Sequence, residues 1–139
     1  MKSASNLQLR DIASSDVLTV TPVSPLDAAV RLFAGHELSS LVVVETGKPV
    51  GIVTERDLFR LMCDGTVGSR KVGEVMTAPV LAAREDLDLA AVRKLMNDRG
   101  VRHIVVLDAA GSVVGALSQH RMLDLLLEES CDELASGLD

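Results

Sequence analysis

Aromatic side chains are scarce in this chain of 139 residues, which has no Trp, no Tyr and two Phe, Phe33 and Phe59. Proteins that bind single-stranded nucleic acid stack the bases on aromatic side chains, so a platform of that kind is excluded. An excess of basic charge is missing as well, because 20 acidic and 14 basic residues give a net charge of −6. Nucleic-acid-binding proteins usually present a clustered basic face, and we therefore expect no nucleic-acid partner.

Long apolar runs and regularly spaced metal ligands are also missing. No apolar run approaches the roughly 20 residues that span a bilayer, and the first six residues lack the apolar stretch of a signal peptide. The two cysteines, Cys63 and Cys131, have neither metal-ligand spacing nor the density of a disulfide scaffold. His36, His103 and His120 show no metal-ligand spacing either. We therefore expect a cytoplasmic protein with no membrane partner and no metal site.

What the chain does contain is an internal repeat. The pair Val17-Leu18 recurs as Val80-Leu81, 63 positions later. After a one-residue insertion, Gly51 recurs as Gly115 at an offset of 64. A period near 60 is too long for a solenoid, and two copies are too few. The repeat instead predicts two small units that pack as one body, with a cleft between them as the natural place for a ligand.

Each copy predicts the same order of elements, β-α-β-β-α. In the first copy we expect strands at 17–20, 41–44 and 50–53 and helices at 25–35 and 54–63. In the second copy we expect strands at 80–83, 104–107 and 113–117 and helices at 86–98 and 118–129. Ser24 and Pro25 indicate a helix start, with Ser24 as the N-cap, and Gly100 indicates a helix end. The predicted fold class is mixed α/β (α+β), with the two units related as a pseudo-two-fold pair.

The repeat also predicts the boundaries of the units. The first unit covers residues 8–64, with a polar lead-in at its start, and the second covers residues 74–129. Between them lies a polar linker, residues 65–73, which contains three glycines. Residues 130–139 form an acidic tail.

One short segment of the first copy combines three residues suited to a nucleotide. Gly51 lets a backbone or a ligand come close, because it has no Cβ. Thr54 lies where a strand meets a helix N-terminus, and the free amides and the helix dipole there favour a phosphate. Asp57, one turn later, offers two acceptor oxygens suited to ribose hydroxyls. Thr54 and Asp57 also fit a helix capping box, and the two roles are compatible.

The segment at residues 50–58, VGIVTERDL, resembles the CBS domain, and residues 114–122, VGALSQHRM, are a weaker match. The resemblance covers roughly residues 8–128. Two copies in tandem resemble a Bateman module, a regulatory unit that typically binds adenosine-containing ligands in clefts between its repeats. This resemblance implies that Thr54 contacts phosphate or ribose and that Asp57 holds the ribose. It also implies that the base lies against the first strand, near Thr19, Val20, Thr21 and Val43.

The second copy departs from this pattern. Ser118 keeps the hydroxyl, but Arg121 stands where an acid is expected. Arginine has no acceptor for a ribose diol, although it can hold a phosphate. The resemblance further implies phosphate-contacting roles for Arg102 and His103, which would equally suit solvated surface positions. The second cleft is therefore either vacant or binds a more anionic ligand.

The sequence thus predicts a non-catalytic regulatory module for signal transduction that senses an adenine nucleotide (AMP, ADP or ATP) or a related adenosyl compound. No catalytic residue or catalytic cofactor is expected, since no nucleophile elbow, phosphate-binding loop or Ser/His/Asp order is present. The downstream effector protein is unknown. Two alternatives remain open: a structural dimerisation module with degenerate pockets, and a metal-dependent enzyme that uses the histidines and Asp57.

A homodimer is the expected assembly. The helices predicted at 54–63 and 118–129 are apolar around most of their circumference, whereas the core of one chain covers only one side of each helix. The other side would be an exposed apolar patch, which soluble monomers rarely tolerate. Pairing with the same patch of a second copy gives a closed two-fold interface.

Overall fold

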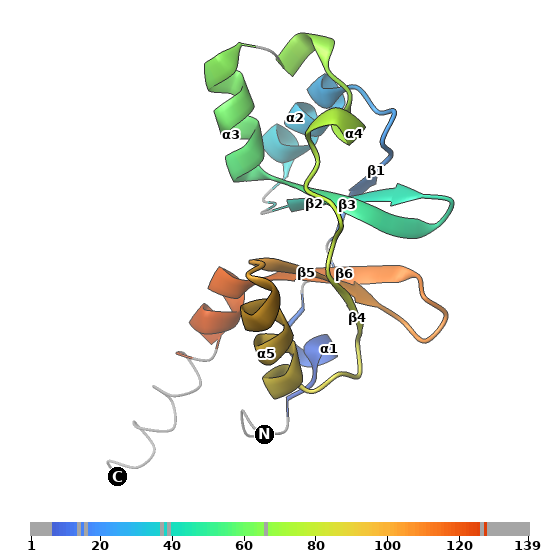
Figure 1. The fold of residues 1–139 in the computed structure, drawn as a ribbon, viewed down its shortest axis with the longest axis vertical. Helices are drawn as coiled ribbons and strands as arrows, with labels where there is room; N and C mark the ends of the chain where they lie inside the picture. The colour runs from blue at the N-terminus through green and yellow to red at the C-terminus, as the bar shows by residue number, and fades with distance from the viewer. Residues whose placement is uncertain are drawn as a thin grey trace.

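The structure is a computed structural model that describes residues 7–13, 15, 17–36, 38, 40–65, 67–125 and 127 of the chain. It contains two three-stranded sheets, ordered β1-β2-β3 and β4-β5-β6. The two sheets lie toward the middle of the molecule, and helices pack on their outer faces (Figure 1). The predicted fold class, a mixed architecture of two related units, is therefore confirmed.

The first unit follows the predicted order of elements. It consists of β1 (Thr19–Val20), α2 (Leu26–Gly35), β2 (Ser40–Glu45), β3 (Lys48–Thr54) and α3 (Glu55–Asp64). β1 pairs with β2 in parallel, and β2 pairs with β3 antiparallel. The first four residues of β2 are buried, as expected of a continuous apolar run that is covered on both faces.

The second unit repeats this order. It consists of β4 (Ala82–Arg84), α5 (Leu89–Arg99), β5 (His103–Leu107) and β6 (Val113–Ser118), followed by helical residues 119–125 and 127. Gly100 ends α5 in the left-handed conformation, with a φ of 63°, as its position predicts. The register shifts at equivalent places in the two sheets, between Val43 and Val44 and between Val106 and Leu107. Residues 126, 128 and 129 of the predicted last helix and the predicted acidic tail lie outside the described residues.

The start of α2 differs from the prediction. The helix begins at Leu26 with Pro25 as its N-cap, and no side chain caps it. The Ser24 hydroxyl instead accepts a hydrogen bond from the Thr21 backbone N–H at 3.1 Å, and the Ser24 carbonyl accepts one from the Val72 N–H at 2.9 Å. Ser24 is therefore used by the turn before the helix and by a contact with a distant segment.

The segments that precede the two units are exchanged between them. α1 (Leu9–Ile12) comes before the first strand of the first unit, yet Leu9 is fully buried in the core of the second unit, and its N–H donates to the Leu87 carbonyl at 2.9 Å. α4 (Val72–Val75) comes before the second unit, and Val72 is fully buried in the core of the first. The predicted polar lead-in and polar linker thus each end in a segment that completes the other unit's core.

Candidate functional site

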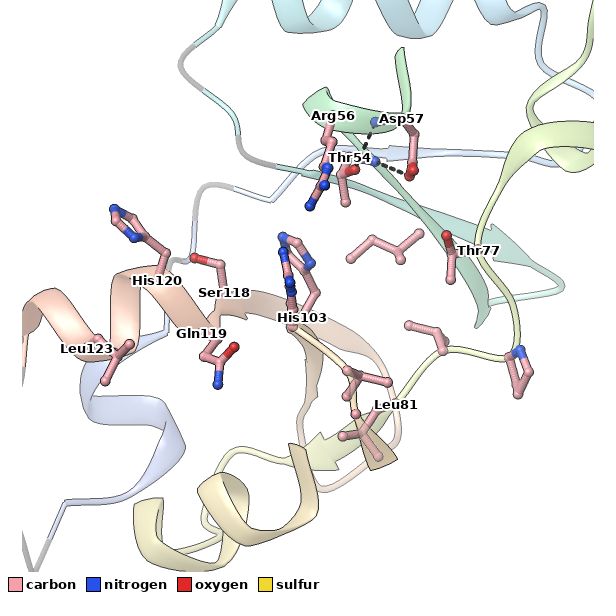
Figure 2. Close-up of a pocket in the computed structure, with 16 residues that line it drawn as sticks. Thr54, Arg56, Asp57, Thr77, Leu81, His103, Ser118, Gln119, His120 and Leu123 are labelled. Atoms are coloured by element: carbon pink, nitrogen blue, oxygen red, sulfur yellow. Dashed lines mark hydrogen bonds between the residues drawn. The ribbon is translucent and has the colours of Figure 1, made fainter. Parts of the chain in front are cut away.

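A cavity of about 680 Å³ lies between the two units, within the range of about 300 to 1,000 Å³ usual for small-molecule sites. The first unit contributes β3 and the start of α3, and the second contributes the segment before β4, the start of β5 and the end of β6 (Figure 2). The lining residues are Ile52, Thr54, Arg56, Asp57, Thr77, Pro79, Val80, Leu81, Gly100, Val101, Arg102, His103, Ser118, Gln119, His120 and Leu123.

Thr54 and Asp57 lie on the wall formed by the first unit, and they form a capping box. Thr54 Oγ1 accepts from the Asp57 N–H at 3.1 Å, and Asp57 Oδ2 accepts from the Thr54 N–H at 3.0 Å (dashed in Figure 2). A carboxylate accepts about four hydrogen bonds. The Asp57 carboxylate therefore caps α3 and still has acceptor positions for the hydroxyls of a ligand.

The wall formed by the second unit supplies basic groups. Arg102 and His103 come from the start of β5, and His103 points across the cavity toward Arg56 of α3 (Figure 2). The Gln119 N–H donates to the Arg102 carbonyl at 2.7 Å, which fixes the start of β5 against the helix that follows β6. The fold thus brings Arg102 and His103 to the same cavity as Thr54 and Asp57.

His103 is half-buried in this wall, and burial lowers the pKa of its imidazole below the ordinary value. The Asp57 carboxylate raises this pKa and the Arg102 guanidinium lowers it, but burial has the largest effect. The imidazole is therefore mostly neutral at pH 7. An anion beside His103 would favour the protonated form, so the charge of this wall depends on what lies next to it.

Gly51 permits a close approach between two segments of the protein. A Cβ at Gly51 would lie 2.5 Å from Met76 Sδ and 3.1 Å from the Thr77 carbonyl oxygen. The next residue, Ile52, exchanges two backbone hydrogen bonds with Thr77, at 3.0 and 2.9 Å. The close neighbours of Gly51 are thus the Met76 side chain and the Thr77 backbone. The missing side chain lets Thr77 lie beside β3 and join the cavity wall.

The residues expected to contact the base do not line this cavity. Val20 and Val43 are buried in the core of the first unit, so their side chains are not available to a ligand. Thr19 and Thr21 are exposed and lie outside the cavity lining.

The cavity wall opposite Thr54 and Asp57, where the base would lie, is formed instead by the segment that leads into β4. It contains Pro79, Val80 and Leu81, which the sequence did not mark as site residues. The repeat offset of 63 relates residues 19–21, expected at the base, to residues 82–84, which directly follow this segment and do not line the cavity. The motif of the first unit lies opposite this segment of the second unit. The sequence also did not mark four polar lining residues as ligand-binding: Arg56, Thr77, Gln119 and His120.

The equivalent motif of the second unit consists of Ser118 and Arg121, and it makes one capping hydrogen bond where Thr54 and Asp57 make two. Ser118 Oγ accepts from the Arg121 N–H at 3.1 Å, which caps the last helix. The Arg121 side chain has no acceptor to return this contact. Ser118 lines the cavity, whereas Arg121 is exposed and does not. Of these two predicted site residues, Ser118 therefore belongs to the cavity wall and Arg121 does not.

Within the described part of the chain, no group of three or more His, Cys, Asp or Glu residues is arranged to hold a metal ion. In the same residues, no helix is both long enough and apolar enough to cross a bilayer.

A family model described as the CBS domain matches the chain twice, at residues 9–64 and 72–128. An uncharacterised protein of Methanopyrus kandleri is 28% identical over 123 residues, which cover 86% of this chain and 63% of that protein. A CBS domain-containing protein of Bacillus subtilis is 27% identical over 130 residues, covering 93% and 90%. An inosine-5'-monophosphate dehydrogenase of Thermoplasma acidophilum is 31% identical over 103 residues, and the chain spans 20% of its length.

Solved structures share the fold. A CBS domain pair in complex with 5'-methylthioadenosine and S-adenosyl-L-methionine gives a TM-score of 0.75 at 24% identity, over 88% of this chain and 98% of that chain. The protein CBSX2 in complex with AMP gives 0.67 at 24% identity, over 87% and 96%. The CBS domain of a bacterial CNNM/CorC family Mg²⁺ transporter in complex with ATP gives 0.75 at 20% identity, over 89% of each chain.

Proposed function

Because the chain belongs to the CBS domain family and its two repeats pack as one pair, we propose that it binds an adenine nucleotide or a related adenosyl compound between them. The observation that supports this most strongly is the cavity of about 680 Å³ that joins the Thr54–Asp57 motif to basic groups of the other repeat. The module transforms nothing chemically, and its output is a change of shape or of affinity for an effector protein.

The cavity offers a different chemistry to each part of such a ligand. The remaining acceptor positions of Asp57 suit a ribose diol, and the Thr54 hydroxyl lies next to them. Arg102 and His103 suit a phosphate, since charge-assisted hydrogen bonds to phosphate are the strong ones. Val80 and Leu81 offer an apolar surface to a base.

A ligand in this position acts by population shift. It contacts both repeats, so it stabilises the relative arrangement of the repeats that it fits best, by the difference in its affinity for the alternatives. The interlocked segments α1 and α4 link each repeat to the core of the other. A change in one repeat is therefore passed to the other through packed side chains.

Calorimetry with AMP, ADP, ATP, 5'-methylthioadenosine and S-adenosylmethionine tests the proposal. We expect saturable binding of at least one of them, and an Asp57→Ala variant should bind about 10 to 100 times more weakly because a charged acceptor is lost. Asp64→Ala is the matched control, since it removes the same charge from the exposed end of the same helix. An Asp57 variant with unchanged affinity would exclude the proposed ribose contact.

We also propose that the protein is a homodimer paired through α3 and the last helix. Phe59 and Met62 of α3 are 70% and 59% exposed, and Leu123 and Leu127 of the last helix are 50% and 62% exposed. These helices come from different repeats and lie on the same side of the molecule in Figure 1. An exposed apolar patch of this kind usually marks an interface.

Light scattering at micromolar concentration measures the assembly. We expect twice the chain mass of 14.8 kDa, and Phe59→Glu should halve the measured mass. Val23→Glu is the control, because Val23 is 71% exposed but lies outside both helices. A monomeric wild-type chain would rule the dimer out.

A further inference from the structure

The cavity contains more basic groups than one phosphate-binding wall requires. Arg102 and His103 lie on the second repeat, but Arg56 lies on the first repeat, at the start of α3. Figure 2 shows Arg56 pointing away from its helix, toward His103. His120, on the helix after β6, extends the basic groups beyond His103. The ligand cavity is therefore basic on both walls.

Two of these basic residues, Arg56 and Arg102, form no ion pair within the described part of the chain, because no carboxylate there lies within ion-pair distance of either guanidinium. His120 differs, because its Nε2 lies 3.4 Å from Asp124 Oδ2. Among the described lining residues, Asp57 is the one carboxylate, and it caps the N-terminus of α3. The described lining therefore has two guanidinium groups and a single carboxylate, an excess of positive charge that an anionic ligand would neutralise.

The lining residues are spread along the cavity, with different chemistry at its two ends. Thr77 and Leu81 lie on one side of the close-up, His103 lies near the middle, and Ser118 and His120 lie on the opposite side (Figure 2). A nucleoside beside Asp57 and Leu81 would have its 5' end near Arg56 and His103. Ser118 and His120 line the cavity beyond this point. A longer chain of phosphates would therefore have these two side chains as additional hydrogen-bond partners.

We propose that the cavity selects a nucleotide with two or more phosphates, and that Arg56 is a residue that determines this specificity. This inference rests on the proposed function and narrows its ligand class. Arg56 contacts the phosphate chain from the first repeat, while Arg102 and His103 contact it from the second. The phosphate chain then joins the two repeats, whereas a monophosphate is held mainly by one of them. A sulfonium ligand is disfavoured, because its positive charge lies near unpaired guanidinium groups.

Calorimetry of the full chain with AMP, ADP, ATP and S-adenosylmethionine, in chelator and at fixed salt, tests this specificity. We expect ADP or ATP to bind at least about tenfold more tightly than AMP, since each charge-assisted contact contributes on that scale. Arg56→Gln should weaken ADP or ATP binding by about tenfold or more and AMP binding by less than about threefold. Arg60→Gln removes the same charge from the next turn of α3, at an exposed position outside the lining, and should leave all affinities within about twofold.

The outcomes distinguish a wrong ligand specificity from a wrong proposed function. AMP binding as tightly as ADP and ATP, or S-adenosylmethionine binding more tightly than all three, would overturn the inference and leave the proposed function standing. Equal losses in the Arg56 and Arg60 variants would show a general charge effect and would also overturn it. If no adenine compound binds, both the proposed function and the inference fail. Circular dichroism of each variant confirms that a loss of affinity is not a loss of fold.

Discussion

Replacing Gly51 with alanine should destabilise the protein through one identifiable contact. The added Cβ would lie 2.5 Å from Met76 Sδ and 2.9 Å from Met76 Cγ, closer than side chains normally pack, and 3.1 Å from the Thr77 carbonyl oxygen. Met76 is half-buried and packs against the core of the first repeat, so shifting its side chain changes that packing. The Thr77 carbonyl is backbone, and it is held in place by the hydrogen bond from the Ile52 N–H. Overpacking of this kind costs about 1 to 3 kcal/mol.

Urea unfolding followed by circular dichroism measures this cost. Gly35→Ala is the matched control, because a Cβ there would meet no atom within 4 Å and alanine favours the helix at that position. We expect Gly51→Ala to lower the unfolding midpoint and Gly35→Ala to leave it unchanged or raise it. Equal unfolding midpoints for the two variants would show that a Cβ at Gly51 causes no overpacking.

A double-mutant cycle identifies the contact itself. Met76→Ala removes the side chain that the new Cβ would meet, so the double variant should be more stable than the sum of the two single changes implies. Contacting residues usually show coupling of about 0.5 to 3 kcal/mol. Simple additivity would mean that the strain arises elsewhere, for example at the Thr77 carbonyl.

Three further changes test other parts of the structure. Leu9→Ala should cost about 2 to 5 kcal/mol in urea unfolding, because Leu9 precedes the first strand of the first repeat yet is fully buried in the core of the second; a loss below about 1 kcal/mol would contradict the exchange. Ser118→Ala should cost about 0.5 to 2 kcal/mol by the same measurement, since it removes the acceptor of the Arg121 N–H. The lowered pKa of His103 means that the unfolded chain binds the proton more readily, so stability should fall as the pH drops below about 6.5. His103→Gln should weaken this acid-side loss in thermal melts between pH 5 and 8, and an unchanged profile would count against it.

Features that depend on residues close together in the chain could be predicted from the sequence. The order of strands and helices follows from local apolar patterns, and the caps at Thr54 and Gly100 follow from the residues at those positions. The duplication was also readable, because equivalent residues recur at a constant offset. These signals lie within a few residues of one another or are repeated outright, so no tertiary information is needed to read them.

Contacts between distant segments could not be predicted in this way, because they depend on the packing of the whole chain. The exchange of α1 and α4 between the repeats depends on contacts between segments far apart in the chain, such as that of Leu9 with the core of the second repeat. In sequence, a short polar segment with one apolar residue resembles a linker, because the distant core against which that residue packs leaves no local pattern. The cavity depends on the same long-range packing, which brings Asp57 of one repeat opposite His103 and Leu81 of the other. The sequence marked Asp57 and His103, but their place in one cavity together with Arg56 follows from how the two sheets pack.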